Sequence, residues 1–385
     1  MNTTGRVIPL LALTGFASMA SMRITDAMLP ALSITFHKPI ADVAQNITVF
    51  TLAYGLMQLV YGPLSDRHGA LWVIGLACLA CALGTFGTAL AQSLPILFLF
   101  RGLSGATAAA IIPLSMAWVG SHVPYERRQV TLMHMLSGTV LGLSIGQLAG
   151  GLLADSFGWQ TAFYLLTGLF LFAGTLLLNA LKRHPELAPR GTGERVNFLE
   201  RIASILAIPR ARQILIFVCL EGIAVFGALA FTATHLHDGL DVSLSLAGGT
   251  VALFGIGGLT FAGLAHRMVT RLGETGLATG GGLLMGFGFI CLALAPWIGL
   301  AMFAAFATGL GFYMMHSTLQ TNATQMAPSA RGTAMALFAG CLFLGQSLGI
   351  ALGGLLLPWS GSTGVLVAAG LWLFMLGLIL ARQLR

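Results

Sequence analysis

Long apolar segments, recurring from one end of the chain to the other, constrain this sequence more than any single motif does. The hydrocarbon core of a bilayer is about 30 Å thick, and an α-helix needs about 20 apolar residues to cross it. Twelve such segments follow one another, and only the stretch between Leu181 and Arg212 leaves room for anything else. We predict spans over residues 8–34, 44–64, 71–92, 95–119, 129–153, 159–180, 213–236, 244–266, 275–296, 299–321, 332–357 and 362–381.

The composition supports a membrane protein, with 57% hydrophobic and 8% charged residues. A soluble domain has about 25% charged residues. The first apolar run continues past Arg23 and Asp26 into eleven more, which favours a retained span over a cleaved signal peptide. The five cysteines fall inside predicted spans, so a disulfide scaffold is not expected. No arrangement of Ser, His and Asp indicates hydrolysis, and we expect neither an enzyme nor a bound cofactor.

The distribution of Lys and Arg orients the predicted spans, because basic residues accumulate in cytoplasmic loops. Of the 19 basic residues, Arg23 and Arg101 lie within spans and Lys38 lies in one set of alternating loops, and all others fall in the other set or at the termini. We therefore expect both termini in the cytoplasm and a multi-pass protein of the bacterial inner membrane. The charges are spread through loops rather than gathered into a basic patch, so nucleic acid is not an expected partner.

An internal repeat divides the chain. PYER at residues 124–127 precedes Gly142, Gly146, Gly150 and Gly151, and PSAR at residues 328–331 precedes a matching series of glycines, Gly345, Gly349, Gly353 and Gly354. Such duplication is common in transporters. We predict two pseudo-symmetric six-helix bundles, residues 1–181 and 213–385. They are joined by a cytoplasmic linker, residues 182–212, with an amphipathic helix over about 196–206.

Charged residues inside the spans are the most specific candidates for a site, because a charge at the centre of a bilayer costs at least ~3 kcal/mol and usually faces a partner or water. Asp26 in span one is expected about 12 Å below the outer surface, and Arg101 in span four about 9 Å below it. The matched depths indicate an ion pair. Either the pair is structural or Asp26 exchanges protons with the solvent. Arg23 lies one turn before Asp26, and Glu221 in span seven matches the depth of His316 in span ten.

Three motifs resemble those of one transporter family. G-x-L-x-D-R-x-G covers residues 62–69, R-G-x-x-G covers 101–105, and G-x-x-x-G-x-x-x-G-G covers 142–151. Together they resemble the major facilitator superfamily, and the third is similar to the motif of its drug:proton antiporters. In this chain Ala70 and Leu71 replace the basic residues that usually follow the first motif, and Gln147 replaces a proline in the third.

The resemblance implies roles for individual residues. Spans one, four, seven and ten would line a central cavity, which brings together Arg23, Asp26, Arg101, Glu221 and His316. Arg101 would take part in proton coupling. The loop after span two would form a cytoplasmic gate, to which we assign Gly62, Asp66, Arg67, Gly69, Arg127, Arg271 and Arg331. The glycines of span five would form a helix-packing motif.

These observations predict an all-α membrane protein with twelve transmembrane helices in the major facilitator fold. It would act as a proton-coupled secondary transporter of small molecules, an efflux antiporter working as a monomer by alternating access. A proton-coupled importer of a small organic anion is the alternative, with Arg23 and Arg101 as binding cations. Metal transport is a further possibility raised by Met133–His134–Met135 and Met314–Met315–His316. Neighbouring residues on a helix point in different directions, however, so neither tripeptide makes a compact metal site.

Overall fold

The computed structural model describes residues 3–184, 187 and 198–384. These residues form α-helices, joined by short turns and 3₁₀ segments. In chain order the elements of the first half are α1 (Thr3–Arg23), η1 (Asp26–Met28), α2 (Leu29–Phe36), α3 (Ile40–His68), α4 (Ala70–Ala89), α5 (Leu94–Ala108), α6 (Ile111–His122), α7 (Tyr125–Phe157) and α8 (Trp159–Arg183). The second half holds α9 (Phe198–Ala207), α10 (Pro209–Leu240), α11 (Leu244–Leu294), α12 (Ile298–Gln325), η3 (Pro328–Ala330) and α13 (Arg331–Gln383).

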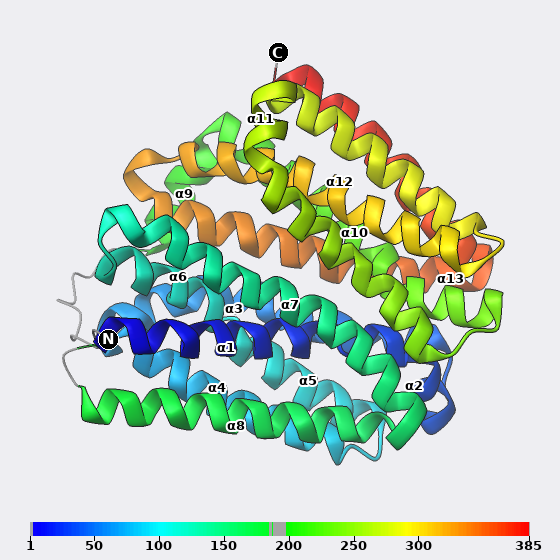
Figure 1. The fold of residues 1–385 in the computed structure, drawn as a ribbon, viewed down its shortest axis with the longest axis horizontal. Helices are drawn as coiled ribbons and strands as arrows, with labels where there is room; N and C mark the ends of the chain where they lie inside the picture. The colour runs from blue at the N-terminus through cyan, green and yellow to red at the C-terminus, as the bar shows by residue number, and fades with distance from the viewer. Residues whose placement is uncertain (1–2, 185–186, 188–197, 385) are drawn as a thin grey trace.

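Ten helical segments of the described chain are long and apolar enough to cross a membrane, and two of them are long enough to cross it twice. At 1.5 Å per residue, the 51 residues of α11 and the 53 residues of α13 are more than twice as long as a bilayer core requires. Each is interrupted at one glycine with non-helical dihedral angles, Gly273 (φ 61°) in α11 and Gly361 (φ 63°) in α13. Figure 1 shows α11 turning back on itself. The twelve predicted crossings are therefore present.

The loop predicted after span two is shorter than expected. The predicted span ended at residue 64, but α3 continues through Gly62 and Pro63 to His68. The turn is a single residue, Gly69, whose φ of 84° is easily adopted only by glycine. Gly273 occupies the same place between the corresponding spans of the second half, again with positive φ.

The glycine series of the two halves pack in the same way. A Cβ at Gly142, Gly146 or Gly150 of α7 would collide with the backbone of α1, and one at Gly345 or Gly349 of α13 would collide with the backbone of α10. Small residues allow such close approach of helices within a membrane. The fifth span thus packs on the first and the eleventh on the seventh, as two pseudo-symmetric six-helix bundles require (Figure 1).

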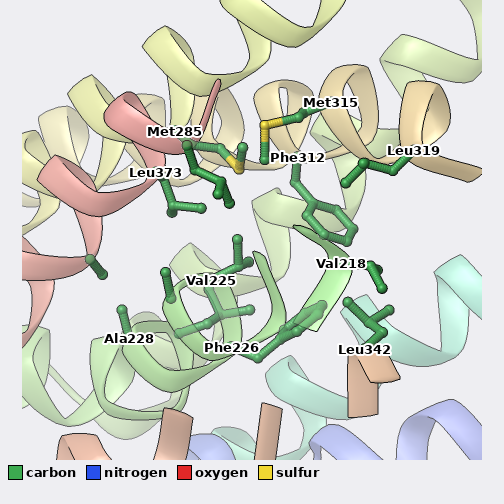
Figure 2. Close-up of a cluster of buried hydrophobic side chains, with 14 of the residues drawn as sticks. Val218, Val225, Phe226, Ala228, Met285, Phe312, Met315, Leu319, Leu342 and Leu373 are labelled. Carbon is green, nitrogen blue, oxygen red and sulfur yellow. The ribbon is translucent and has the colours of Figure 1, made fainter. Parts of the chain in front are cut away.

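Two ends of the molecule can be distinguished. We call the end with the turns at Gly69 and Gly273 the basic end, and the opposite end, where α10 meets α11, the far end. The halves contact each other through α3 with α13 and through α7 with α11, and η1 contacts α10 and α11. The largest cluster of buried apolar side chains fills the second half (Figure 2) and includes Ala27 and Leu143 from the first.

The contacts between α3 and α13 fade toward the basic end. The Ser347 hydroxyl donates to the carbonyl of Thr48 at 3.1 Å, and a Cβ at Gly55 would lie 3.2 Å from Phe343 Cβ. Gly62 lies seven residues further along nearly the same face of α3. A Cβ at Gly62 would have no neighbouring atom within 4 Å. At the far end, by contrast, one carboxylate oxygen of Asp155 on α7 accepts from the Ser245 amide at 2.7 Å and from its hydroxyl at 2.6 Å. The halves are joined at the far end and diverge toward the basic end.

Candidate functional site

The first membrane span is broken where its charged residues lie. α1 ends at Arg23, a single 3₁₀ turn begins at Asp26, and α2 begins at Leu29. Pro30, in the first turn of α2, has no amide hydrogen to give to the carbonyl of Asp26, which removes one helical hydrogen bond from this segment. The side chains of Arg23 and Asp26, three residues apart, meet at this break inside the bundle.

Arg23 and Asp26 form a fully buried ion pair. Arg23 Nη1 lies 3.3 Å from Asp26 Oδ2, and the two side chains are 2% and 1% exposed. The same carboxylate oxygen accepts a hydrogen bond from Gln147 Nε2 of α7 at 3.4 Å. The pair is thereby held against the fifth span, which belongs to the same half.

Arg23 also contacts the second half of the molecule. Its Nη2 donates to Gln346 Oε1 of α13 at 3.3 Å, and its Cζ lies 4.3 Å from the centre of the Phe226 ring of α10. A guanidinium over an aromatic face is a favourable cation–π arrangement. Arg23 is therefore a buried charge that links the two halves.

The expected pairing of Asp26 with Arg101 is wrong. Arg101 is fully buried, but its Nη1 donates to the Ser21 carbonyl at 2.9 Å, its Nη2 to the Thr25 hydroxyl at 3.4 Å, and its Cζ lies 4.2 Å from the Phe50 ring centre. The physical reason is the break in the first span, which leaves carbonyls at the end of α1 without helical partners. A cation at the C-terminal end of a helix also interacts favourably with the helix dipole.

A second pair lies in the second half, as the matched depths predict. His316 Nδ1 of α12 lies 2.7 Å from Glu221 Oε2 of α10, and the side chains are 14% and 0% exposed. The imidazole stacks on Phe312 with 4.9 Å between ring centres. The ring centre of Phe338 on α13 lies 5.3 Å from that of His316.

Aromatic rings connect the two pairs. The guanidinium of Arg23 lies over the face of Phe226. Phe226 contacts Phe312 edge to face with 5.3 Å between ring centres, and the imidazole of His316 stacks on Phe312. Figure 2 shows Phe226 and Phe312 facing each other from α10 and α12. Both pairs thus adjoin one apolar, aromatic layer.

Several buried polar atoms in this region have no hydrogen-bond partner among the described residues. They include donors and acceptors: Arg23 Nε, Asp26 Oδ1, Gln147 Oε1, Glu221 Oε1 and Gln346 Nε2. Buried polar atoms are nearly always paired, so a group of unpaired ones indicates a place where water, protons or a ligand bind. Both carboxyl groups keep one oxygen free in this way.

The residues predicted to form a gate lie at the basic end. Arg67, Arg127, Arg271 and Arg331 are exposed there, and the side chain of Asp66 lies outside the described residues.

Contact residues that were missed at the level of sequence include Phe50, Phe226 and Gln346. Gln346 directly follows a glycine of the α13 series, just as Gln147 follows one in α7. An amide beside the packing glycines of both halves was a signal that could have identified it. Nothing in the sequence distinguishes Phe50 and Phe226 from the other phenylalanines, of which the chain has 24 in all.

Comparison with known proteins agrees with the architecture. The model of the Major Facilitator Superfamily matches residues 11–349. An uncharacterised MFS-type transporter of Bacillus subtilis, YceJ, is 26% identical over 363 residues, which cover 93% of this chain and 90% of that protein. The probable multidrug resistance protein EmrY of Escherichia coli is 27% identical over 180 residues, 46% of this chain and 35% of EmrY.

Solved structures share the fold at low sequence identity. A bacterial homologue of the human lysosomal transporter Spinster, in an inward-facing and occupied conformation, superposes with a TM-score of 0.80 at 17% identity, covering 100% of this chain and 97% of that one. The nucleoside transporter NupG gives a TM-score of 0.78 at 14% identity, covering 98% and 100%. From its sequence, its fold and these matches, the chain belongs to the major facilitator superfamily of membrane transporters.

Proposed function

We propose that this transporter is a proton-coupled antiporter that exports small molecules across a bacterial inner membrane by alternating access. The excess of Lys and Arg at the basic end supports a cytoplasmic location for that end and for both termini. With this orientation, the divergence of the halves toward the basic end corresponds to a state open to the cytoplasm. We further propose a monomer in which residues 182–212 connect the bundles 1–181 and 213–385.

The observation that carries the proposal is the Arg23–Asp26 pair at the break of the first span. Asp26 is buried, bears one unpaired oxygen, and holds an arginine that contacts the other half. A proton on Asp26 removes the charge that holds Arg23, and so weakens a contact that must change when the halves rock. Protonation can therefore be coupled to the opening of the far end.

Export is supported by two observations. The glycine motif of α7 resembles that of drug:proton antiporters, and EmrY, a relative over part of the chain, is described as a probable multidrug resistance protein. The alternative, an importer of organic anions, receives less support. Both terminal nitrogens of Arg101 are engaged at the end of α1, so only Arg23 remains near the interface between the halves.

The remaining gate residues fit the same cycle. We propose that Asp66 and Arg67, with Gly62, Gly69, Arg127, Arg271 and Arg331, close the basic end when the far end opens. We propose that this end is open in the state described here, and the exposure of the four arginines supports it.

The test is flux in proteoliposomes with an imposed pH gradient, screened against lipophilic cations and organic anions. Asp26→Asn should abolish accumulation driven by the gradient, while downhill exchange of the same substrate persists. Asp238→Asn is the matched control, since it makes the same chemical change at an exposed position. Gradient-driven flux in Asp26→Asn equal to that of the parent would refute the assignment of Asp26.

A further inference from the structure

A small cavity opens at the basic end of the second half, where α10 begins and where α12 and α13 end. Its polar lining includes Arg210, Gln213, Asn322 and Gln383. The cavity measures about 30 Å³. A water-sized group needs about 10–15 Å³. The cavity therefore has room for part of a ligand, such as two oxygens of a phosphate group, and not for a whole transported molecule.

The rest of the lining is apolar. Ile214, Phe217, Leu319 and Leu380 line the cavity, and each of them is buried. A soluble anion gains nothing from such walls. The carbon atoms next to the phosphate of a lipid, by contrast, leave water when they lie against them.

Arg210 is held in place by a neutral group. Its Nη2 donates to Asn322 Oδ1 at 2.9 Å, and Asn322 Nδ2 donates in turn to Glu274 Oε2 and to the Thr318 carbonyl, each at 3.0 Å. The amide of Asn322 thus stands between Arg210 and the nearest carboxylate of this chain of hydrogen bonds. A guanidinium has five N–H donors in a planar fork. Those that remain can bind the oxygens of a phosphate as a bidentate pair.

Positive charge predominates in the segments that adjoin the cavity, which are α9, the first turn of α10 and the last turn of α13. α9 contacts both of the other helices. The charged side chains of these segments are all exposed, and four of the five are cations: Glu200, Arg201, Arg210, Arg212 and Arg382. An anion is therefore attracted to this surface, whereas an ammonium group is repelled from it.

The adjoining helix indicates that this surface lies at the edge of the membrane. α9 ends three residues before Arg210. Leu206 and the following Ile208 are 42% and 38% exposed, and Arg201 is exposed on the same short helix. Exposed apolar and basic side chains together are typical of a helix that lies in the interface of a membrane. Lipid headgroups are consequently within reach of the cavity.

We infer that this cavity binds the phosphate of an anionic phospholipid, with the guanidinium of Arg210 as its main contact and the apolar lining against the carbon atoms beside the phosphate. The shared chemistry, a phosphate on an arginine, also suits a soluble phosphate compound. The buried apolar walls favour the lipid. The inference goes beyond the proposed antiport and does not depend on it.

The probe is dioleoyl phosphatidylglycerol, titrated into the purified full-length transporter after removal of bound lipid in detergent. Native mass spectrometry gives the dissociation constant of the first lipid bound. Phosphatidylcholine with the same chains has the same phosphate but carries an ammonium group, and it should bind at least about fivefold more weakly. Inorganic phosphate at millimolar concentration should not displace phosphatidylglycerol.

Variants test the two parts of the site. Arg210→Gln should weaken binding of phosphatidylglycerol about tenfold or more, because a charge-assisted hydrogen bond is lost. Arg210→Lys keeps the charge without the planar fork and should have an intermediate affinity. Leu384→Trp adds bulk to the lining while Arg210 is unchanged, and it should also weaken binding. Arg183→Gln, the same chemical change at an exposed residue of α8, is the control and should bind as the parent does.

Thermal melting provides a second measurement. A ligand stabilises the folded state that it binds. Phosphatidylglycerol should therefore raise the melting temperatures of the parent and of Arg183→Gln more than that of Arg210→Gln.

Equal affinity for phosphatidylglycerol in the parent and in Arg210→Gln would overturn the inference, as would equal affinity of the parent for the two lipids. Displacement by inorganic phosphate would assign the cavity to a soluble phosphate compound instead. Unchanged binding in Leu384→Trp would place the lipid elsewhere on the basic end. None of these measurements requires transport, so a negative result leaves the proposed antiport unaffected.

Discussion

At the scale of single residues, the two buried arginines of the first half differ in what holds them. Arg101 closes the end of a helix within its own half, and its partners are a carbonyl, a hydroxyl and a ring. Arg23 pairs with a carboxylate and contacts the other half. Only the second arrangement joins groups of both halves, so we propose a coupling role for Arg23 and Asp26 and a positioning role for Arg101.

The Arg23–Asp26 pair can be tested with a double-mutant cycle. Arg23→Gln and Asp26→Asn should each cost about 3–5 kcal/mol of unfolding free energy, because each leaves one buried charge unpaired. The double variant should recover most of that loss, since both charges are gone. Thermal melting of the four proteins gives the stability, and flux under a pH gradient gives the function.

Stability and coupling should separate in this cycle. The double variant is expected to melt close to the parent yet to show no gradient-driven flux. A double variant that regained both would identify the pair as structural, and would move the search for the coupling group to Glu221 and His316.

Arg101 should show the opposite behaviour. Arg101→Gln removes a charged donor from a buried carbonyl, so we expect a loss of about 1–3 kcal/mol of stability. The protein that does fold should still couple flux to the pH gradient, because Asp26 keeps Arg23. Normal melting combined with uncoupled flux in Arg101→Gln would instead place Arg101 in the proton pathway.

At the scale of helices, the glycine series fix how closely the first and fifth spans approach. A Cβ at Gly146 would lie 2.8 Å from both the Cα and the carbonyl oxygen of Ala20, which is closer than real Cβ contacts. The backbone of α1 cannot move aside without shifting Arg23 and the break that follows it. The packing of these two helices therefore determines where the ion pair lies.

Gly146→Ala should consequently lower the melting temperature and reduce flux. Gly168→Ala on α8 is the matched control, since a Cβ there meets nothing within 4 Å. Alanine favours a helix over glycine by about 1 kcal/mol, so the control should be as stable as the parent or slightly more. Equal melting temperatures for the two variants would show that the close approach of α7 to α1 is not needed.

At the scale of the whole molecule, the far end is closed in part by a contact between α7 and α11. Asp155 accepts two hydrogen bonds from Ser245 at the first residues of α11, where helix amides lack partners of their own. If alternating access operates, this contact must break once in each cycle.

Cross-linking tests that requirement. Asp155→Cys and Ser245→Cys, in a variant without the native cysteines, should react with a short, reducible bifunctional thiol reagent. Cross-linked protein should lose transport and regain it on reduction, because the far end can then open. Undiminished transport by quantitatively cross-linked protein would mean that these helices stay together throughout the cycle.

The orientation in the membrane is tested by labelling. Ser204 on α9 is exposed, and from the charge distribution we expect α9 to lie in the cytoplasm. In the same cysteine-free background, Ser204→Cys should react with an impermeant thiol reagent in disrupted but not in intact cells. Labelling in intact cells would invert the assigned topology and with it the direction of transport.

The features that the sequence alone determined are local. The number of spans follows from the length of the apolar runs, and the turns at Gly69 and Gly273 and the amphipathic α9 follow from short stretches of chain. The glycine series in both halves predicted the repeat, because closely packed helices need small residues at every fourth position.

Only the tertiary structure decided which groups meet. Sequence placed Asp26 and Arg101 at similar depths in the membrane, but depth is one coordinate, and contact also depends on how each helix is rotated and where it bends. In the folded protein Asp26 pairs with Arg23, three residues before it, while Arg101 donates to the Ser21 carbonyl near the end of α1. The contacts of Arg23 with Phe226 and Gln346 join segments more than half the chain apart, and no pattern within either segment specifies them.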